Sequence, residues 1–339
     1  MPKKIILRDE LLSVLDKVKP GLSNDEIIEQ STHFIFEKNS IRTYNDDIAI
    51  FQEIKTGLMG AVKASEFYNL IKKMVDKEIG INQTDDAFVI TGETLKASIK
   101  IDKEIKIVKI KRPADKSSDW KDLPSDFNTA IELGLFSVSK NMNIPELSCL
   151  NISGKYVFSS DSYRATKQKM KASFDGSFLL PAISAKELKG YDICKVAISA
   201  DGWLHFSNKD KTFFSCRTYS GKPYPSAIDD FFVVKGKKIK LPSSFGEMVD
   251  RVSSLVIADF DLDRVVDLKI GEGKIVCTGK GKHGSVSDEI KVNYKGKGID
   301  VRAHPGFLVE VLGKSTSMVI GDRLLFTGKG FEHALCLSS

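Results

Sequence analysis

Three aspartates at alternate positions are the residues best suited to do chemistry in this 339-residue chain. Asp259, Asp261 and Asp263 occur in the segment ADFDLD, and on a strand they would share one face. Clustered carboxylates of this kind hold Mg²⁺ for phosphodiester cleavage. The following residues, RVVDLKI, alternate as a strand does, which favours a solvated loop that enters a strand. A metal-dependent DNA-acting enzyme that uses these aspartates is kept as an alternative function.

A glycine-rich segment, TGKGKHG, places Gly279, Gly281 and Gly284 at the spacing of a nucleotide-binding loop. A loop of that kind must be followed by a helix, because the helix N-terminus faces the phosphate. The next residues, SVSDEIKV, alternate like a strand instead. The segment therefore predicts a hairpin tip, and we expect no nucleotide cofactor.

The histidines and cysteines show no spacing typical of a metal site or a catalytic nucleophile. The cysteines are widely spaced, include no C-x-x-C pair and mostly lie in apolar strand patterns, which predicts buried, reduced thiols. We therefore expect no catalytic residue, no metal and no cofactor. The residues in question are His33, His205, His283, His304 and His333, with Cys149, Cys194, Cys216, Cys277 and Cys336.

The composition is that of a soluble globular protein with two or three domains, because 42% of the residues are hydrophobic and 28% are charged. The formal net charge of +6 permits an anionic partner such as nucleic acid without requiring one. No apolar run approaches the ~18 residues of a membrane span. The N-terminal residues lack the apolar core of a signal peptide. We expect a cytoplasmic protein with no membrane contact.

The order helix, strands, helix, hairpin recurs three times, with a repeat of about 113 residues. Each repeat opens with an amphipathic helix, predicted at residues 8–18, 132–142 and 244–254. The second helices are predicted at residues 64–74, 184–191 and 304–314. Hairpins follow them, with turns at Asp85-Asp86, Asp201-Gly202 and Gly321-Asp322.

Two short helices against many strands predict an α+β fold in which both helices of each repeat cover one face of antiparallel sheets. Unpaired strand edges at the ends of each repeat invite pairing with the next. We therefore expect a curved array whose sheets continue across domain boundaries, and closure into a ring would remove the free edges. The expected domains are 1–122, 123–232 and 233–339. The Lys-rich residues 100–125 and the shorter 233–240 are interpreted as connectors, the first as a solvated linker strand.

Local motifs in all three repeats match one known family. The first repeat contains the helix RDELLSVLDKV and the strand pair SIRTYNDDIAIFQEI, whose turn holds Thr43 and Asp46. The second contains SSDSYRAT and FFSCRTYSGKPYPS, which correspond to the family's Thr-Asp-Gly-His-Arg-Leu and Ser-Arg-x-x-x-Gly-x-Phe/Tyr-Pro segments. The third ends in FLVEVLGK and HALCLSS. Over essentially its whole length the chain resembles the bacterial-type sliding clamp, the beta subunit of the replicative DNA polymerase.

The resemblance implies a non-enzymatic processivity factor, a head-to-tail homodimer of three-domain subunits that encloses duplex DNA. Helices would line the hole and contact phosphates without reading the sequence. The partners implied are DNA polymerase, the clamp loader and other replication and repair proteins. The basic residues expected to face DNA are Arg8, Lys72, Lys73, Lys140, Lys186, Lys189, Arg251 and Lys314.

The resemblance also implies a groove between the second and third domains that docks short peptides from these partners. Its expected residues are Leu147, Ser160, Ser162, Tyr163, Arg164, Ala165, Pro225, Phe231, Leu335, Cys336 and Leu337. The sequence departs from the family here, because Ser162-Tyr163 replaces Gly-His and Ala165 replaces Leu. The usual Met-Pro-x-Arg-Leu tail is also replaced by Leu335–Ser339. Such changes would suit a phage-encoded clamp that serves its own polymerase, as well as one from the bacterial cytoplasm or nucleoid. A strand-rich module that binds only protein is a third alternative.

Overall fold

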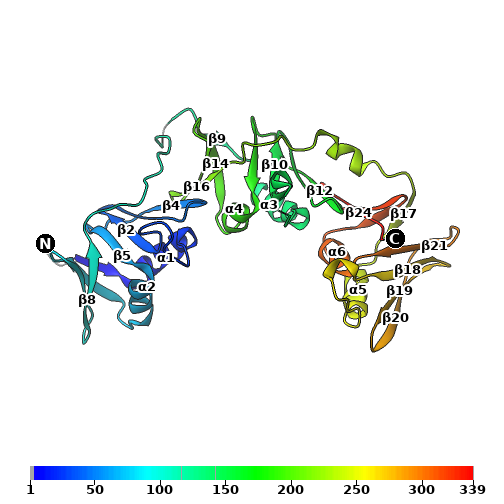
Figure 1. Cartoon of the computed structure of the whole chain (residues 1–339), viewed down its shortest axis with the longest axis horizontal. Coiled ribbons are helices and arrows are strands. Elements are labelled where there is room, and N and C mark those ends of the chain that lie inside the picture. The colour runs from blue at the N-terminus through cyan, green and yellow to red at the C-terminus, as the bar shows by residue number, and fades with distance from the viewer. Residues whose placement is uncertain (1–3, 116, 142, 339) are drawn as a thin grey trace. The chain divides into compact units, whose positions relative to one another are not determined.

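The computed structural model describes residues 4–115, 117–141 and 143–338. The chain forms two compact units (Figure 1). The first unit comprises Met1–Asn128 and Lys186–Thr218, and the second comprises Thr129–Ala185 and Tyr219–Ser339. The expected middle domain thus contributes strands to both units, and two of the three divisions fall within helices α3 (Phe127–Gly134) and α4 (Ala182–Leu188).

The first unit is built on one antiparallel sheet of twelve strands, in the order β1-β6-β7-β8-β5-β2-β3-β4-β16-β15-β14-β9. The strands from the first expected domain are β1 (Lys4–Leu7), β2 (His33–Glu37), β3 (Ser40–Tyr44), β4 (Ile48–Glu53), β5 (Met59–Lys63), β6 (Glu78–Gln83), β7 (Ala87–Thr91) and β8 (Lys96–Asp102). The short strand β9 (Lys121–Asp122) also falls in the first expected domain, and the second contributes β14 (Ile193–Ile198), β15 (Trp203–Asn208) and β16 (Thr212–Arg217). Pairing of β4 with β16 joins the two sets, so the sheet continues across the expected domain boundary.

Helices α1 (Arg8–Val18) and α2 (Ala64–Lys73) pack on this sheet because each has one apolar face. Leu11, Leu15 and Val18 are fully buried on α1, at the spacing that predicted the helix. Beneath α2, the ring of Phe67 meets that of Phe36 at a centroid distance of 5.4 Å in an edge-to-face contact. Burial of these side chains holds both helices on the same sheet.

The second unit contains an eight-stranded sheet, β13-β10-β11-β12-β24-β23-β22-β17, and a four-stranded sheet, β20-β19-β18-β21. The first consists of β10 (Cys149–Ser153), β11 (Tyr156–Ser160), β12 (Arg164–Lys169), β13 (Ser177–Pro181), β17 (Lys237–Lys240), β22 (Ser317–Ile320), β23 (Arg323–Thr327) and β24 (Phe331–Cys336). The second consists of β18 (Val266–Gly271), β19 (Lys274–Gly281), β20 (Gly284–Lys291) and β21 (Ile299–Ala303). Pairing of β12 with β24 again carries a sheet across an expected domain boundary.

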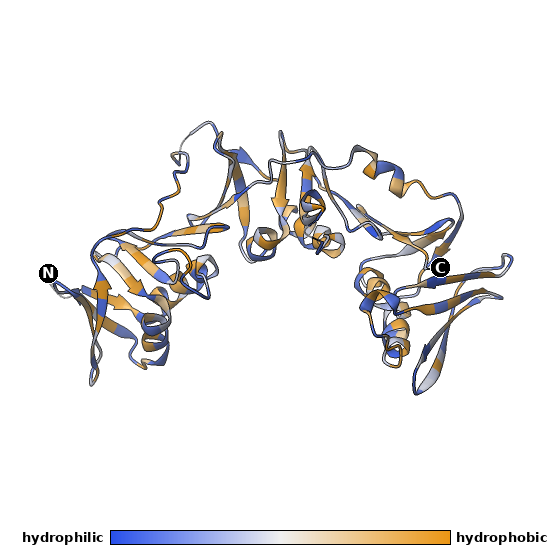
Figure 2. Cartoon of the chain, viewed as in Figure 1, coloured by the Kyte–Doolittle hydropathy of each residue, from blue (hydrophilic) through white to orange (hydrophobic). Residues whose placement is uncertain are grey.

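One large apolar core fills the second unit beneath helices α5 (Phe245–Ser253) and α6 (Pro305–Leu312), which contact each other. Phe245, Met248, Val249 and Val252 are all at most 1% exposed, as their helical spacing predicted. Apolar and polar residues are interspersed along the strands of both units (Figure 2). The fold is therefore the α+β arrangement of helices on antiparallel sheets that the sequence predicted.

Five of the six predicted helices are confirmed, with ends shifted by no more than three residues. The exception is the helix predicted at 132–142, which is wrong. The chain forms α3 from Phe127 to Gly134 and continues as a 3₁₀ turn over Leu135–Ser137. Phe127, Ala130 and Ile131 supply its buried face, so the helix begins earlier than the pattern suggested. Residues 138–141 have no regular structure, and Met142 lies outside the described residues.

No helix in the described ranges of the chain is both long enough and apolar enough to cross a membrane.

Candidate functional site

The turn between β11 and β12 exposes an aromatic ring, because a carboxylate organises its backbone. Asp161 Oδ1 accepts the backbone N–H groups of Tyr163 at 3.1 Å and Arg164 at 3.0 Å. Ser162 adopts a left-handed φ of 76°, where glycine is usually favoured. The turn is thus a capped loop rather than a two-residue hairpin, and it leaves Tyr163 51% exposed.

Arg164 ties this turn to helix α6. Its side chain is nearly buried and donates from Nε to Asp161 Oδ2 at 3.0 Å. A second ion pair joins its guanidinium to Glu310 on α6. The same guanidinium lies 3.9 Å from the ring centroid of Phe307, at cation–π distance. These contacts fix the position of Tyr163 relative to α6.

A cavity of about 390 Å³ opens on one side of Tyr163. The last strand closes it, because β24 pairs with β12 and the Cys336 N–H donates to the Tyr163 carbonyl at 2.8 Å. Beyond the strand, the Ser338 N–H donates to the Arg302 carbonyl at 2.9 Å. The cavity is lined by Tyr163, Leu262, Asp263, Val265, Arg302, His304, Phe307, Leu335, Cys336, Leu337 and Ser338.

A second cavity of about 440 Å³ shares Tyr163, Leu262 and Phe307 with the first. It therefore continues the same surface past the exposed ring. Its remaining lining comes from the irregular segment after α3, from the turn itself and from the loop before β18. These residues are Val138, Ser139, Lys140, Asn141, Ile144, Asp161, Ser162, Arg164 and Asp261.

The structure brings together six of the eleven groove residues expected from the sequence. Those that line one or both cavities are Ser162, Tyr163, Arg164, Leu335, Cys336 and Leu337. Leu147 and Ala165 instead belong to an adjacent buried cluster, against which Phe231 packs. Ser160 is buried and donates to the Arg164 carbonyl, and Pro225 is exposed just before the 3₁₀ segment Ser226–Phe232. These five residues line neither cavity.

Sequence reasoning missed the wall contributed by α6 and by the loop before β18. Leu262, His304 and Phe307 lie there, and no local pattern connects these segments. His304 caps α6, because its Nδ1 accepts the Phe307 N–H at 3.3 Å and its Nε2 lies 2.8 Å from the Asp261 carbonyl. Burial lowers the pKa of His304, which favours the neutral tautomer with the proton on Nε2. The histidine thus connects the loop to the helix start and is not placed as a metal ligand.

The three aspartates of ADFDLD do not share a strand face, because they lie in the loop before β18 that the sequence favoured. Asp261–Asp263 form a 3₁₀ turn, as the loop interpretation allowed, and β18 begins only at Val266. Asp259 pairs with Lys282 at 2.8 Å, and Asp261 pairs with Arg264 at 3.3 Å. Among the described residues, no group of three or more His, Cys, Asp or Glu side chains could hold a metal ion.

The hairpin predicted for TGKGKHG is confirmed, since β19 turns directly into β20. Its first two glycines allow a close approach of the chain that directly follows α5. A Cβ on Gly279 would lie 2.6 Å from Val256 Cγ2, and one on Gly281 would lie 2.0 Å from the Leu255 carbonyl oxygen. A Cβ on Gly284 would meet open space. Packing therefore accounts for two of the three glycines of the motif.

Cysteine side chains are free, as expected, and three of the five are buried. Burial raises the pKa of the Cys149 thiol to about 11 and that of Cys277 to about 12. Such thiols are protonated at neutral pH and are poor nucleophiles. Cys336 differs in its position, because it lines the first cavity and is only partly buried.

The basic residues expected to face DNA fall into two groups. The six lysines are exposed, on or directly after helices or in the segment after α3: Lys72, Lys73, Lys140, Lys186, Lys189 and Lys314. The two arginines are already paired. Arg8 contacts Asp9 and donates to the Met74 carbonyl, and Arg251 pairs with Asp288 at 2.7 Å.

No family model and no curated protein matches the sequence. Solved structures do match it over its full length. The beta chain of DNA polymerase III from Streptococcus pneumoniae is 17% identical, with a TM-score of 0.86 and 100% of both chains covered. The sliding clamp from Bartonella birtlesii, bound to griselimycin, is 15% identical with a TM-score of 0.86, and that from Bacillus subtilis is 16% identical with a TM-score of 0.85. Both cover 99% of each chain. The chain therefore has the sliding-clamp fold from end to end, as the sequence resemblance implied.

Proposed function

We propose that this protein is a DNA sliding clamp, a processivity factor that encircles duplex DNA and tethers a replicative polymerase. The observation that carries the proposal is the likeness of the whole fold to sliding clamps, at TM-scores of 0.85 to 0.86. Fold alone is weak evidence for an enzyme, whose function lies in a local site. A clamp acts by enclosure, so the arrangement of its sheets and helices is itself the functional part.

The proposed subunit has three domains, 1–122, 123–232 and 233–339, and two subunits would join head to tail. Edge strands support this arrangement: β1 lies at one edge of the twelve-stranded sheet, and β20 and β21 lie at the edges of the four-stranded sheet. Exposed edges of this kind are available for pairing with another chain. The protein would have no catalytic activity of its own and would act in a bacterial or phage-infected cell.

Contacts with DNA are proposed to come from the exposed lysines rather than from the two arginines. A lysine ammonium on a flexible stem makes weak, exchangeable contacts with phosphates, which suits sliding. Arg8 and Arg251 are neutralised by neighbouring carboxylates and so would contribute less. Charge reversal at Lys72, Lys73 and Lys189 should therefore weaken retention on DNA and flatten its salt dependence.

The two cavities beside Tyr163 are proposed to dock short peptides of the polymerase, the clamp loader and repair proteins. Their volumes lie within the range of about 300–1,000 Å³ typical of ligand pockets. Leu262, Phe307 and Leu337 supply apolar surface, while Arg302 and Ser139 supply polar groups that could orient a peptide. The exposed Tyr163 ring would be the central contact.

The test of the clamp function is topological. The protein is loaded onto nicked circular DNA by a clamp loader, and the DNA is then cut once. A clamp should remain on the circle and leave the linear product by running off its ends. Equal retention on circular and linear DNA, or small-angle scattering from a particle without a central hole, would contradict the proposal.

The docking site is tested separately with Tyr163→Ala combined with Leu337→Ala. This variant should lose polymerase stimulation and still be retained on circular DNA. Ile198→Ala is a matched control, because that side chain is 43% exposed and lies in the first unit. A bound partner peptide should also protect Cys336 from a thiol reagent. Unchanged polymerase stimulation by the double variant would show that the docking site lies elsewhere.

A further inference from the structure

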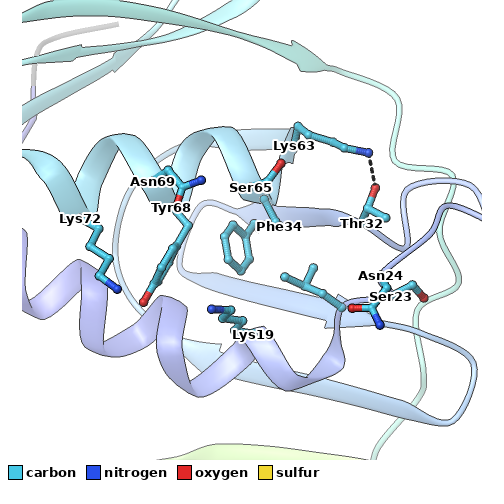
Figure 3. Close-up of a pocket in the computed structure, with 12 residues that line it drawn as sticks. Lys19, Ser23, Asn24, Thr32, Phe34, Lys63, Ser65, Tyr68, Asn69 and Lys72 are labelled. Atoms are coloured by element: carbon cyan, nitrogen blue, oxygen red, sulfur yellow. Dashed lines mark hydrogen bonds between the residues drawn. The ribbon is translucent and has the colours of Figure 1, made fainter.

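A separate cavity of about 470 Å³ lies in the first unit, beside α2 and the chain that follows α1 (Figure 3). The fully buried Phe34 from β2 forms part of its wall, and Tyr68 and Lys72 project from α2 toward Lys19. The sequence patterns did not single out this cavity, because its lysines come from segments far apart in the chain. Its volume is large enough for one nucleotide-sized ligand.

Two lysine ammonium groups converge on one aromatic ring in this cavity. Lys19 Nζ lies 4.6 Å from the centroid of the Tyr68 ring, and Lys72 Nζ lies 5.8 Å from it. Neither ammonium forms an ion pair with any residue in the described ranges. Lys63 contrasts with them, because it binds the Glu26 carboxylate at 3.1 Å and Thr32 Oγ1 at 2.7 Å. Two of the three lysines in the cavity thus have charge available for an anion.

The surrounding groups favour an anion with several oxygen atoms. Ser65 and Asn69 on α2 and Asn24 in the loop line the same space and can donate hydrogen bonds. The Asp16 carboxylate accepts a hydrogen bond from the Tyr68 hydroxyl at 2.6 Å and so holds the ring in place.

We propose that this cavity binds the phosphate group of a nucleotide between Lys19 and Lys72, with Tyr68 as its aromatic wall. A phosphate matches the site because its oxygens can accept from both ammonium groups and from the neighbouring amide and hydroxyl at once. The cavity, at about 470 Å³, also has room for the attached nucleoside. This inference goes beyond the proposed clamp function, in which lysines make only transient contacts. The ligand is either a free nucleotide or a nucleotide of an exposed DNA strand.

Calorimetric titration with three probes tests the site. The probes are deoxyadenosine 5′-monophosphate, deoxyadenosine without phosphate, and a ten-residue single-stranded oligonucleotide. We expect the phosphate to raise affinity at least tenfold over the nucleoside. Lys19→Met with Lys72→Met keeps the apolar stems and should lower affinity for the phosphate probes at least tenfold. Lys96→Met with Lys209→Met removes two exposed charges elsewhere in the same unit and should change affinity less than twofold.

The outcomes distinguish a free nucleotide from a DNA strand as the ligand, and they test the cavity proposal separately from the clamp function. Binding of the mononucleotide supports a free ligand, whereas binding of only the oligonucleotide supports a DNA strand. Equal losses in the two double variants would mean non-specific attraction and would overturn the inference, as would absence of binding by all probes. The loading assay on circular DNA is run on the same variants. If the wild-type protein is retained on circular DNA but binds none of the three probes, the clamp function is supported and the cavity proposal is refuted.

Discussion

Replacing Arg164 by alanine should destabilise the second unit, because it removes the connection between the turn and α6. The guanidinium is 8% exposed and pairs with two carboxylates, so the substitution leaves both without their cation. Asp161 is the more costly of the two, because it is only 15% exposed, whereas Glu310 is 48% exposed and can be hydrated.

The magnitude follows from these exposures. Removing one partner of a fully buried ion pair costs about 3–5 kcal/mol. Asp161 keeps two backbone N–H donors, and Glu310 reaches water, so the lower part of that range applies. Loss of the contact with Phe307 adds about 0.5–1 kcal/mol. We expect the free energy of unfolding to fall by about 3.5–4 kcal/mol, which lowers the Tm by roughly 7–16 °C in a unit of this size.

The assay can distinguish the two units, because both tryptophans, Trp120 and Trp203, belong to the first. Circular dichroism at 222 nm reports both units, and tryptophan fluorescence reports the first. Arg164→Ala should shift the dichroism transition more than the fluorescence transition. Arg323→Ala is the matched control: its pairing with Asp322 is exposed and its ring contact with Phe231 is 4.6 Å, so it should cost about 1 kcal/mol. A shift for Arg164→Ala no larger than that of Arg323→Ala would refute the reasoning.

Three further perturbations test other parts of the structure. Burial lowers the pKa of His333 to about 3 and that of His205 to about 4, whereas the unfolded value is about 6.5. Below pH 6.5 the unfolded chain therefore binds protons that the folded chain does not. The free energy of unfolding should be unaffected above pH 6.5 and should fall by roughly 1.4 kcal/mol per group and pH unit below it. Urea titrations from pH 7 to pH 4 measure this loss, and a flat profile would contradict it. Gly281→Ala should cost about 1–3 kcal/mol, because the Leu255 carbonyl must move away from the new Cβ, whereas Gly284→Ala should cost under 1 kcal/mol. Equal effects would show that the chain after α5 does not pack on this strand. Ser162→Gly should stabilise the protein by about 1 kcal/mol, because glycine adopts the positive φ of residue 162 without strain. A lower denaturation midpoint for the variant would contradict this prediction.

Local periodicity predicted most of the fold because most elements bury one face. Helix α1 was placed over its observed residues, since its buried leucines and valine recur at helical spacing. Helix α3 was misplaced because apolar residues continue past its end, through Leu135 and Phe136, and give no stop signal. Its end is determined by packing instead: a Cβ on Gly134 would lie 2.9 Å from Leu150 Cδ2. Leu150 belongs to β10, and the pattern of residues along α3 does not predict which strand packs against the helix.

The candidate site was predictable only where it is formed by neighbouring residues in the sequence. The turn from Asp161 to Arg164 was identified because a short polar segment separates two alternating strands. The wall opposite it comes from Leu262 and Phe307, which are brought to the turn by the packing of α6. The resemblance named Leu335 and Leu337, which line the first cavity, and also Leu147 and Ala165, which are buried in the neighbouring cluster.

The turn also shows how a site can keep its backbone while its chemistry changes. The family segment that it resembles has Gly-His where this chain has Ser162-Tyr163. Ser162 nevertheless takes the left-handed conformation that suits glycine, and Asp161 supplies the hydrogen bonds that hold it there. The cost of the positive φ, about 1 kcal/mol, is offset within the turn itself. The backbone can thus present residue 163 to the cavities whatever its side chain. The chemistry presented is then set by Tyr163, whose larger ring with a hydroxyl both narrows the space beside Leu337 and adds a hydrogen-bonding group.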